Sequence, residues 1–269
     1  MAREKVELAF QLAITFAVLL AFQPLPVHAA ATLIQQNSAG CIGCIGAPPV
    51  VVSFPSSVAG GNVIVVGVVI QVGTVNSVSD SKDSTFTQAA TRGGSVYIYV
   101  ATLSSSGSDT VTVTFSGAVP PEEVVYIYEV SGVTTTGAGT GTGSGDGTSM
   151  STSAVTFLSG AFLLGIIGTG CASATAGAGF TLSPAPAGTC MSHAQYSTSG
   201  VSSPTTFPAT VAFETTWVEV GVAFKPAVPV GGEIVSVNQF LVALPWLALF
   251  AVLGVAVVGA HVVGQRKRK

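Results

Sequence analysis

Short runs of apolar or alternating residues recur along the chain from about residue 50 to residue 224, separated by clusters of Gly, Ser, Asp and Pro. This pattern is typical of β-strands joined by turns. The stretch 63–70 is apolar except at Gly67, which predicts a strand buried on both faces at the centre of a sheet. No stretch between residues 32 and 232 has the 3.6-residue period of a helix. We expect strands at 50–54, 62–72, 84–90, 95–103, 109–116, 123–130, 153–157, 161–169, 178–183, 189–197, 207–214 and 216–224.

Many short strands without helices predict an all-β domain over residues 32–226, built as a two-sheet antiparallel sandwich. The segment is long for seven strands, so a jelly-roll-like arrangement is favoured. The tract 134–153, TTTGAGTGTGSGDGTSMSTS, has the composition of a flexible linker. We interpret it as a loop within one sandwich, because the half that precedes it is too small to form a closed domain.

The N-terminal residues have the pattern of an export signal. Arg3 and Lys5 precede an apolar run over 8–22, and small residues around Ala29 offer cleavage sites. A run of this length is short for a membrane span, so residues 1–31 are predicted to be a signal peptide. An uncleaved anchor is the alternative.

The C-terminal residues predict a membrane anchor. Residues 240–263 carry no formal charge, and as a helix they would be about 36 Å long, enough to cross a bilayer. Residues 227–239 form a short stalk before it, and the basic tail 264–269 predicts that this end is cytoplasmic. We therefore expect a single-pass protein of the cell membrane with an extracellular domain, and the lipid bilayer is its predicted partner through residues 240–263.

Composition excludes two further classes of protein. Charged residues make up 8% of the chain, hydrophobic residues 48%, and the mean hydropathy is +0.66. A disordered chain needs the opposite balance. The net charge is -3 and Lys and Arg form no stripe outside the ends, so no nucleic-acid partner is expected.

Several segments resemble, in order and spacing, an uncharacterised family of β-sandwich domains found in secreted and cell-surface proteins of bacteria and archaea. The resemblance implies a β-sandwich over roughly 50–226 and brings no catalytic residues with it. This chain departs from the family pattern at Asp83-Ser84, where a Gly-Asn turn is usual, and in its longer loop at 134–153. The C-terminal stretch resembles archaeal cell-surface anchors. The matching segments are AGGNVIVVGVVI (59–70), VNSVSDSKDSTFTQAA (75–90), SVYIYVATL (95–103), DTVTVTFSG (109–117), VVYIYEVSGV (124–133), SGAFLLGIIG (159–168) and WVEVGVAFKP (217–226).

The four cysteines are predicted to form disulfides, because the chain carries an export signal. Cys171 ends one predicted strand and Cys190 starts a later one, so these two can face each other. Cys41 and Cys44 either pair with each other or stay reduced. A redox CxxC motif is disfavoured because no helix follows it, and a four-thiolate zinc site because the second pair is not close in sequence. No metal or cofactor is expected.

The predicted domain lacks an obvious catalytic set, so we do not expect an enzyme. His193 is its only histidine, and no G-x-S-x-G motif accompanies it. Glu122 and Glu123 are neighbours and should point to opposite faces of a strand. Glu123 and Glu129 share a face but are about 20 Å apart, too far for a glycosidase pair. Two further carboxylates, in the motif DSKD (80–83), offer too few oxygens for Ca²⁺ and are better explained by a turn.

Aromatic residues are the best candidates for binding. Tyr97 and Tyr99 share a face of one strand, and Tyr126 and Tyr128 share a face of another. If those strands pair, the four rings form either a patch for sugars or partner chains, or part of the core. The last strand should bury Val218, Val220, Val222 and Phe224 and expose Trp217 as a ligand contact.

The function predicted from the sequence is structural or adhesive, as a component of a cell envelope or filament. Its expected partners are other copies of itself, other cell-surface proteins, or glycans. The alternative is a carbohydrate-binding surface module that uses exposed aromatic rings. A hydrolase with His193 as the base is the least favoured hypothesis.

Overall fold

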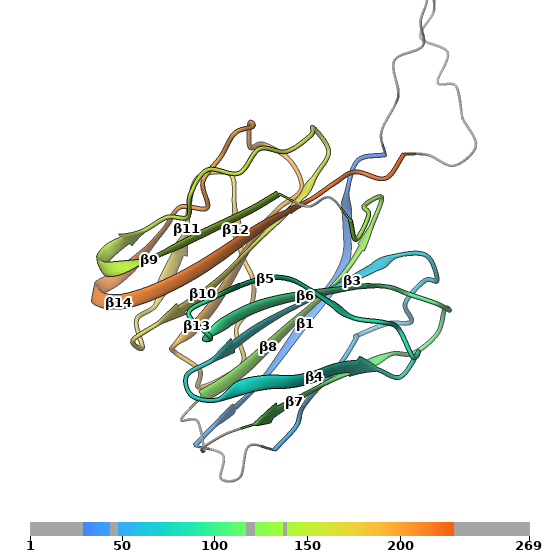
Figure 1. The fold of residues 1–269 in the computed structure, drawn as a ribbon, viewed down its shortest axis with the longest axis horizontal. Coiled ribbons are helices and arrows are strands. Elements are labelled where there is room, and N and C mark those ends of the chain that lie inside the picture. Colours follow the sequence, from blue (N-terminus) through green and yellow to red (C-terminus); the bar gives the residue numbers. More distant parts are fainter. Residues whose placement is uncertain (1–28, 44–47, 117–121, 137–138, 229–269) are drawn as a thin grey trace, which may run out of the picture. The chain divides into compact units, whose positions relative to one another are not determined.

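The chain forms a stack of three antiparallel β-sheets (Figure 1). The computed structural model describes residues 29–43, 48–116, 122–136 and 139–228, all within a compact unit that ends at Val228. These ranges contain strands and turns and no α-helix. The all-β, antiparallel class predicted from the sequence is therefore confirmed, whereas the predicted pair of sheets is wrong in number.

The central sheet has the strand order β1-β8-β3-β6-β5, and a three-stranded sheet has the order β2-β7-β4. The six-stranded sheet has the order β11-β14-β10-β13-β12, with β9 on the other edge of β14. The central strands are β1 (Thr32–Ile42), β8 (Glu122–Ser131), β3 (Val63–Ile70), β6 (Val96–Thr102) and β5 (Thr87–Arg92). The three-stranded sheet contains β2 (Val50–Ser53), β7 (Thr110–Ser116) and β4 (Thr74–Asp80). The six-stranded sheet contains β9 (Gly139–Met150), β10 (Phe162–Thr169), β11 (Ala174–Ala176), β12 (Thr181–Leu182), β13 (Ser192–Ser197) and β14 (Ala209–Phe224).

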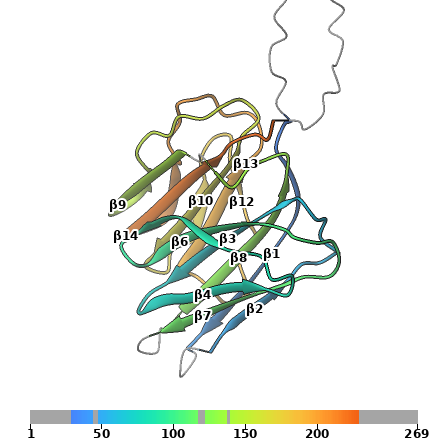
Figure 2. The ribbon, with the colours of Figure 1, turned by 45° about the vertical axis from the view of Figure 1, so that its right-hand side comes forward.

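The central sheet lies between the other two (Figure 2), and its middle strand explains why. Every residue of β3 is buried, as its continuous apolar sequence predicts. Successive side chains of a strand point to opposite faces, so a strand that is apolar on both faces needs a covering layer on each side. At Gly67 the six-stranded sheet comes so close that an added Cβ would lie 2.2 Å from Cδ1 of Ile166.

Two hydrophobic cores result, one on each face of the central sheet. The core against the six-stranded sheet includes Val63, Val65, Ile98, Tyr126, Tyr128, Phe162, Leu164, Ile166, Val220, Val222 and Phe224. The core against the three-stranded sheet includes Ile64, Val66, Val68, Tyr97, Val111, Val113, Phe115, Val125 and Ile127. The strand expected at 109–116 is confirmed as β7, in which Val111, Val113 and Phe115 are buried and the threonines between them are half-buried.

Several strand predictions need correction. β1, β4, β9 and β11 were not expected, because their sequences are rich in polar or small residues and their burial is partial. The strand expected at 153–157 is reduced to a single bridge between Val155 and Thr205. The strands expected at 207–214 and 216–224 are one strand, β14, whose pairing with β9 is interrupted by a bulge between Thr210 and Thr215.

The most informative correction concerns the Gly-rich tract 134–153, which is a strand over most of its length. β9 pairs with β14 from Gly139 opposite Ala223 to Met150 opposite Ala209. Its alternate glycines share one face, and the following segment crosses that face in direct contact. An added Cβ would lie 2.5 Å from the Ser153 carbonyl oxygen at Gly141 and 2.2 Å from the Ser151 carbonyl oxygen at Gly143. The alternate glycines are therefore required by close backbone packing. The interpretation of this tract as a flexible loop, which was based on its composition, is wrong.

The predicted membrane-related segments lie almost entirely outside the described residues, which begin at Ala29 and end at Val228. This applies to the signal peptide, the stalk, the helix expected at 240–263 and the basic tail. Within the described ranges, no helix has the length and apolar character that a membrane crossing requires.

We expect Gly141→Ala to destabilise the domain by about 1–3 kcal/mol, because the new methyl group meets a backbone carbonyl that cannot rotate away. Thr140→Ala, in the same strand at an exposed position, is the matched control and should change stability by less than about 0.5 kcal/mol. Urea unfolding followed by tryptophan fluorescence measures both effects. Equal stability of the two variants would contradict the close packing inferred for this face.

Candidate functional site

The four tyrosines do not form one patch. β6 and β8 are separated by β3, and the ring pairs occupy opposite faces of the central sheet. Tyr126 and Tyr128 are fully buried, and their hydroxyls reach across the core to the Ser192 carbonyl oxygen (2.9 Å) and to Ser183 Oγ (2.7 Å). Burial raises the pKa of both phenols. These two rings are part of the core, and they connect the central and six-stranded sheets.

The other ring pair packs on the opposite side. Tyr97 is 7% exposed and Tyr99 is half-buried, and their rings stack with centroids 6.2 Å apart. The Tyr97 hydroxyl donates to the Gly94 carbonyl oxygen, and the Tyr99 hydroxyl donates to Oε1 of Gln88. Only Tyr99 therefore retains substantial exposure, and a binding surface made of four rings is excluded by the strand order.

Trp217 is also buried, contrary to the expectation that it faces solvent. Its side chain does point away from the central core, but the outer face of the six-stranded sheet is itself covered, and Trp217 is only 8% exposed. The indole lies against β9, where an added Cβ at Gly143 or Gly145 would come within about 3.0–3.2 Å of it. The sequence pattern identified the correct face of β14. It did not reveal the loops that cover that face.

One predicted disulfide is confirmed. Cys171 and Cys190 are bonded, with Cα atoms 4.4 Å apart, and they close the segment between β10 and β13. Cys41 lies in β1, and no cysteine within the described ranges is a free thiol. Cys44 lies outside those ranges.

Two buried glutamates of β8 accept hydrogen bonds from neighbouring segments. Glu122 accepts the N–H groups of Cys190 and Met191 and the hydroxyl of Ser192, which attaches the disulfide loop to the central sheet. On the opposite face, Glu129 accepts the N–H of Ala59 and side-chain amides of Gln35 and Asn62. These donors satisfy carboxylates that would otherwise be costly to bury, so both residues have structural roles.

A third buried glutamate lies with His193 on the covered outer face of the six-stranded sheet. Glu219 Oε1 accepts a hydrogen bond from Nε2 of Gln195 at 3.1 Å, whereas its Oε2 has no partner. Burial raises the pKa of Glu219 to about 8, although the bond from Gln195 lowers it. His193 is 8% exposed, its Nε2 lies 2.7 Å from the Ala172 carbonyl oxygen, and burial lowers its pKa.

This arrangement is poorly suited to the hydrolase hypothesis. A general base needs access to substrate and a nucleophile within hydrogen-bond reach. His193 is covered, and its Nε2 is hydrogen-bonded to the backbone carbonyl oxygen of Ala172. Across the described part of the chain, no three His, Cys, Asp or Glu side chains converge as a metal-binding group.

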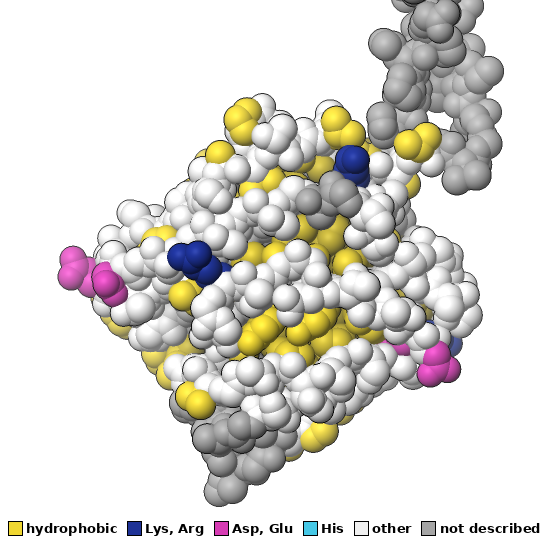
Figure 3. Space-filling model, in the orientation of Figure 1, with side chains coloured by type: hydrophobic (Ala, Val, Ile, Leu, Met, Phe, Trp, Pro, Cys, Tyr) yellow, Lys and Arg dark blue, Asp and Glu magenta, His cyan; other side chains and the backbone are white. Residues whose placement is uncertain are grey.

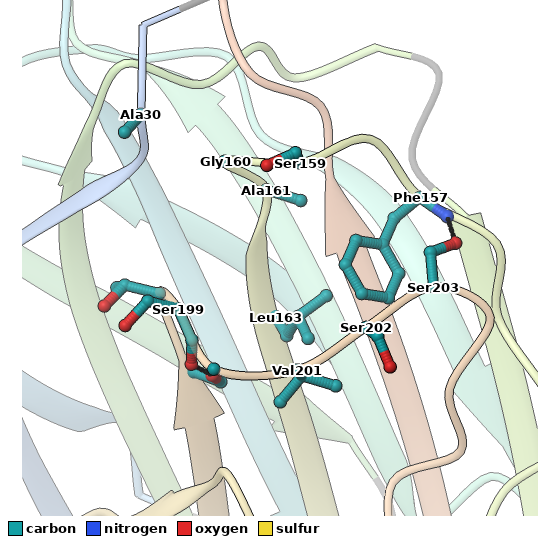
Figure 4. Close-up of a pocket in the computed structure, with 13 residues that line it drawn as sticks. Ala30, Phe157, Ser159, Gly160, Ala161, Leu163, Ser199, Val201, Ser202 and Ser203 are labelled. Atoms are coloured by element: carbon teal, nitrogen blue, oxygen red, sulfur yellow. Dashed lines mark hydrogen bonds between the residues drawn. The ribbon is translucent and has the colours of Figure 1, made fainter.

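A depression on the outer face of the six-stranded sheet has a volume of about 440 Å³ (Figure 4). Its floor is Leu163 of β10, and its walls are the loops 157–161 and 197–203. Ser203 Oγ accepts the N–H of Phe157 at 2.9 Å, which holds the two loops together. The lining combines hydroxyl groups with apolar side chains and has no ionisable side chain. Such a site suits a neutral ligand with both polar and apolar faces.

On the face shown in Figure 3, backbone and uncharged polar side chains cover most of the surface. Charged side chains on this face are few and scattered, and apolar side chains are visible between the layers. The loop 197–203, STSGVSS, was not singled out from the sequence because a Ser-rich segment between strands is typical of an ordinary turn. Its contribution to a concave site depends on the opposing loop, which is about 40 residues away in the sequence.

Comparison with known proteins does not add an assignment. No family model, no curated protein and no solved structure matches this chain.

Glu219→Gln is expected to stabilise the domain at alkaline pH. Because the pKa of Glu219 is raised from 4.5 to about 8, its contribution to stability is complete below about pH 4.5 and is lost as the pH rises towards 8. The amide keeps the shape and the hydrogen bond without ionising. We expect a gain of about 2–4 kcal/mol at pH 8 and little difference at pH 4, measured by urea unfolding.

Glu214→Gln, which removes an exposed carboxylate of the same strand, is the control and should show no such pH-dependent difference. A constant difference between Glu219→Gln and the unsubstituted protein from pH 4 to pH 9 would contradict the raised pKa.

Proposed function

We propose that this protein is a membrane-anchored cell-surface component whose β domain has a structural or adhesive role. The export-signal pattern and the apolar segment 240–263 support the location. The stack of three sheets with two hydrophobic cores supports the role, because it provides a rigid body. The largely uncharged face shown in Figure 3 suits repeated contacts with neighbouring molecules.

The observation that carries this proposal is the closeness of the two ends of the β domain. Thr32, at the start of β1, pairs with Ser131 of β8, and the Ala227 N–H donates to the carbonyl oxygen of the next residue, Gly132, at 2.7 Å. Both ends of the described β domain therefore lie side by side (Figure 2). This arrangement suits a domain held by a tether, because most of its surface stays available for contacts.

We expect a form of the protein restricted to residues 31–232 to associate with itself or to bind cell-surface material. Light scattering over a range of concentrations measures the mass, and electron microscopy of the concentrated sample shows whether polymers are ordered. A monomer at every concentration that also fails to bind isolated cell envelopes would contradict the proposal.

Binding of a neutral glycan is a second candidate function, favoured by the depression over Leu163. Its hydroxyl groups and apolar floor match the alternating polar and apolar faces of a sugar ring. This hypothesis replaces the earlier one based on exposed aromatic rings, since Trp217 and three of the four tyrosines are buried.

If this second function is correct, wild-type protein should retain neutral oligosaccharides on a glycan array, and Ser202→Trp should abolish the signal by filling the depression. Ser202 is exposed, so the substitution should leave the core intact. Ser149→Trp, at an exposed position of β9, is the matched control and should bind normally. Glycan binding that survives Ser202→Trp would exclude this site.

A further inference from the structure

Two aspartates lie on the inner face of the three-stranded sheet, at the end of its core. Asp80 is the last residue of β4 and pairs with Val111 of β7. Asp109 lies two residues before Val111, so its side chain points to the same face as that buried valine. Asp80 and Asp109 are thus diagonal neighbours on adjacent strands, a relation that leaves their side chains within reach of each other.

One oxygen of each carboxylate organises the local backbone. Asp80 Oδ1 accepts the N–H groups of Lys82 and Ser84, at 3.1 and 2.8 Å. Asp109 Oδ1 accepts the N–H and the hydroxyl of Ser81, at 3.1 and 2.8 Å, together with the N–H of Thr110. Both aspartates therefore converge on the turn 81–84, which leads from the three-stranded sheet to the central sheet.

The second oxygen of each carboxylate has no partner. Asp80 Oδ2 and Asp109 Oδ2 are both inaccessible to solvent and accept no hydrogen bond, and the same is true of Ser84 Oγ. Asp109 as a whole is only 2% exposed. A buried carboxylate oxygen without a donor is costly, and three unpartnered oxygens around the turn 81–84 make this a favourable place for a ligand.

The neighbouring cation does not neutralise these groups. The Lys82 ammonium group donates to the Ser106 carbonyl oxygen at 3.2 Å and forms no ion pair with Asp80 or Asp109. Two carboxylates therefore face the core end without a counter-charge within ion-pair distance. A cation would supply both the missing charge and the missing partner for each oxygen.

We propose that Asp80, Asp109 and Ser84 bind a divalent cation of the Ca²⁺ type. Ca²⁺ prefers carboxylate, hydroxyl and carbonyl oxygens and accepts irregular coordination, whereas Zn²⁺ and Cu²⁺ prefer nitrogen and sulfur ligands, which this turn lacks. Three side chains leave room for water and carbonyl oxygens to complete the shell. The bound ion would fix the β4–β5 turn to the start of β7 and thereby close this end of the second core.

The sequence motif that suggested Ca²⁺ pointed to a different pair of residues. Asp83 is exposed and has a φ of 56°, a backbone role typical of a turn, so the turn interpretation of DSKD holds for that residue. The second carboxylate comes instead from Asp109, far along the chain, through the pairing of β4 with β7.

The test is calcium titration of the folded domain by isothermal calorimetry, with thermal unfolding in Ca²⁺ and in EDTA. We expect saturable binding in the range of about 10⁻⁴–10⁻³ M and a melting temperature that rises with Ca²⁺ concentration. Asp109→Asn should weaken binding at least about tenfold, and Ser84→Ala should weaken it severalfold without removing the backbone bonds to Asp80. Asp83→Asn, which removes an exposed carboxylate from the same turn, is the matched control and should bind normally.

A buried water that donates to the unpartnered oxygens is the competing explanation. It predicts no binding heat and no change in melting temperature up to about 10 mM Ca²⁺ or Mg²⁺, a result that would overturn the proposal. Equal weakening by Asp83→Asn and Ser84→Ala would also overturn it, because binding would then depend on general surface charge. If Asp109→Asn does not fold, the comparison of Ser84→Ala with Asp83→Asn still decides the question.

Discussion

Two-sided burial of the central sheet is the constraint on which the rest of the structure depends. β3 and β8 are buried along nearly their whole length, and each has apolar side chains on both faces of the central sheet. A single covering sheet leaves half of that surface in water, at a cost of about 25 cal/mol for each Å² of apolar area. The three-stranded and six-stranded sheets are therefore both required to cover the central sheet.

The layers are held in register by polar groups at the margins of these cores. Glu122 and Tyr126 of β8 both bond to the segment that begins β13, and Glu129 bonds to the loop before β3. Within the described ranges these carboxylates accept N–H and hydroxyl donors and form no ion pairs. A chain with only 8% charged residues can thus still fix the relative position of its sheets, because backbone amides provide donors that do not depend on charged side chains.

The sequence predicted the strands that are apolar and missed those whose formation depends on close packing. β3, β6, β7, β8 and β10 have β-branched or aromatic residues in clear runs, so their existence follows from local pattern. β9 consists mainly of Gly, Thr and Ser, and its strand structure follows from contacts with Trp217 and the backbone at Ser151 and Ser153. These residues come together only in the folded chain, so the local sequence pattern does not reveal the contacts. The number of sheets was underestimated for the same reason.

The candidate sites show the same difference between features that follow from local sequence and features that depend on contacts between distant segments. The Cys171–Cys190 bond was predictable because the export-signal pattern favours oxidised cysteines and the two residues flank neighbouring strands. Face assignment within a strand was also reliable, as Trp217 does point away from the central core. Exposure was not predictable, because it depends on which loops cross a face. The depression over Leu163 and the pairing of Asp80 with the Asp109 region both arise from segments that are distant in sequence.

The closeness of Thr32 and Ala227, which contact the consecutive residues Ser131 and Gly132, has a consequence for how this domain can be combined with others. A fold whose two ends are adjacent can be inserted into a surface loop of a second protein without stretching either one, and its ends can be joined and reopened elsewhere. The β domain therefore has the geometry of a transferable module. New ends placed in an exposed turn, such as the one at Gly93 and Gly94 between β5 and β6, should leave all three sheets intact.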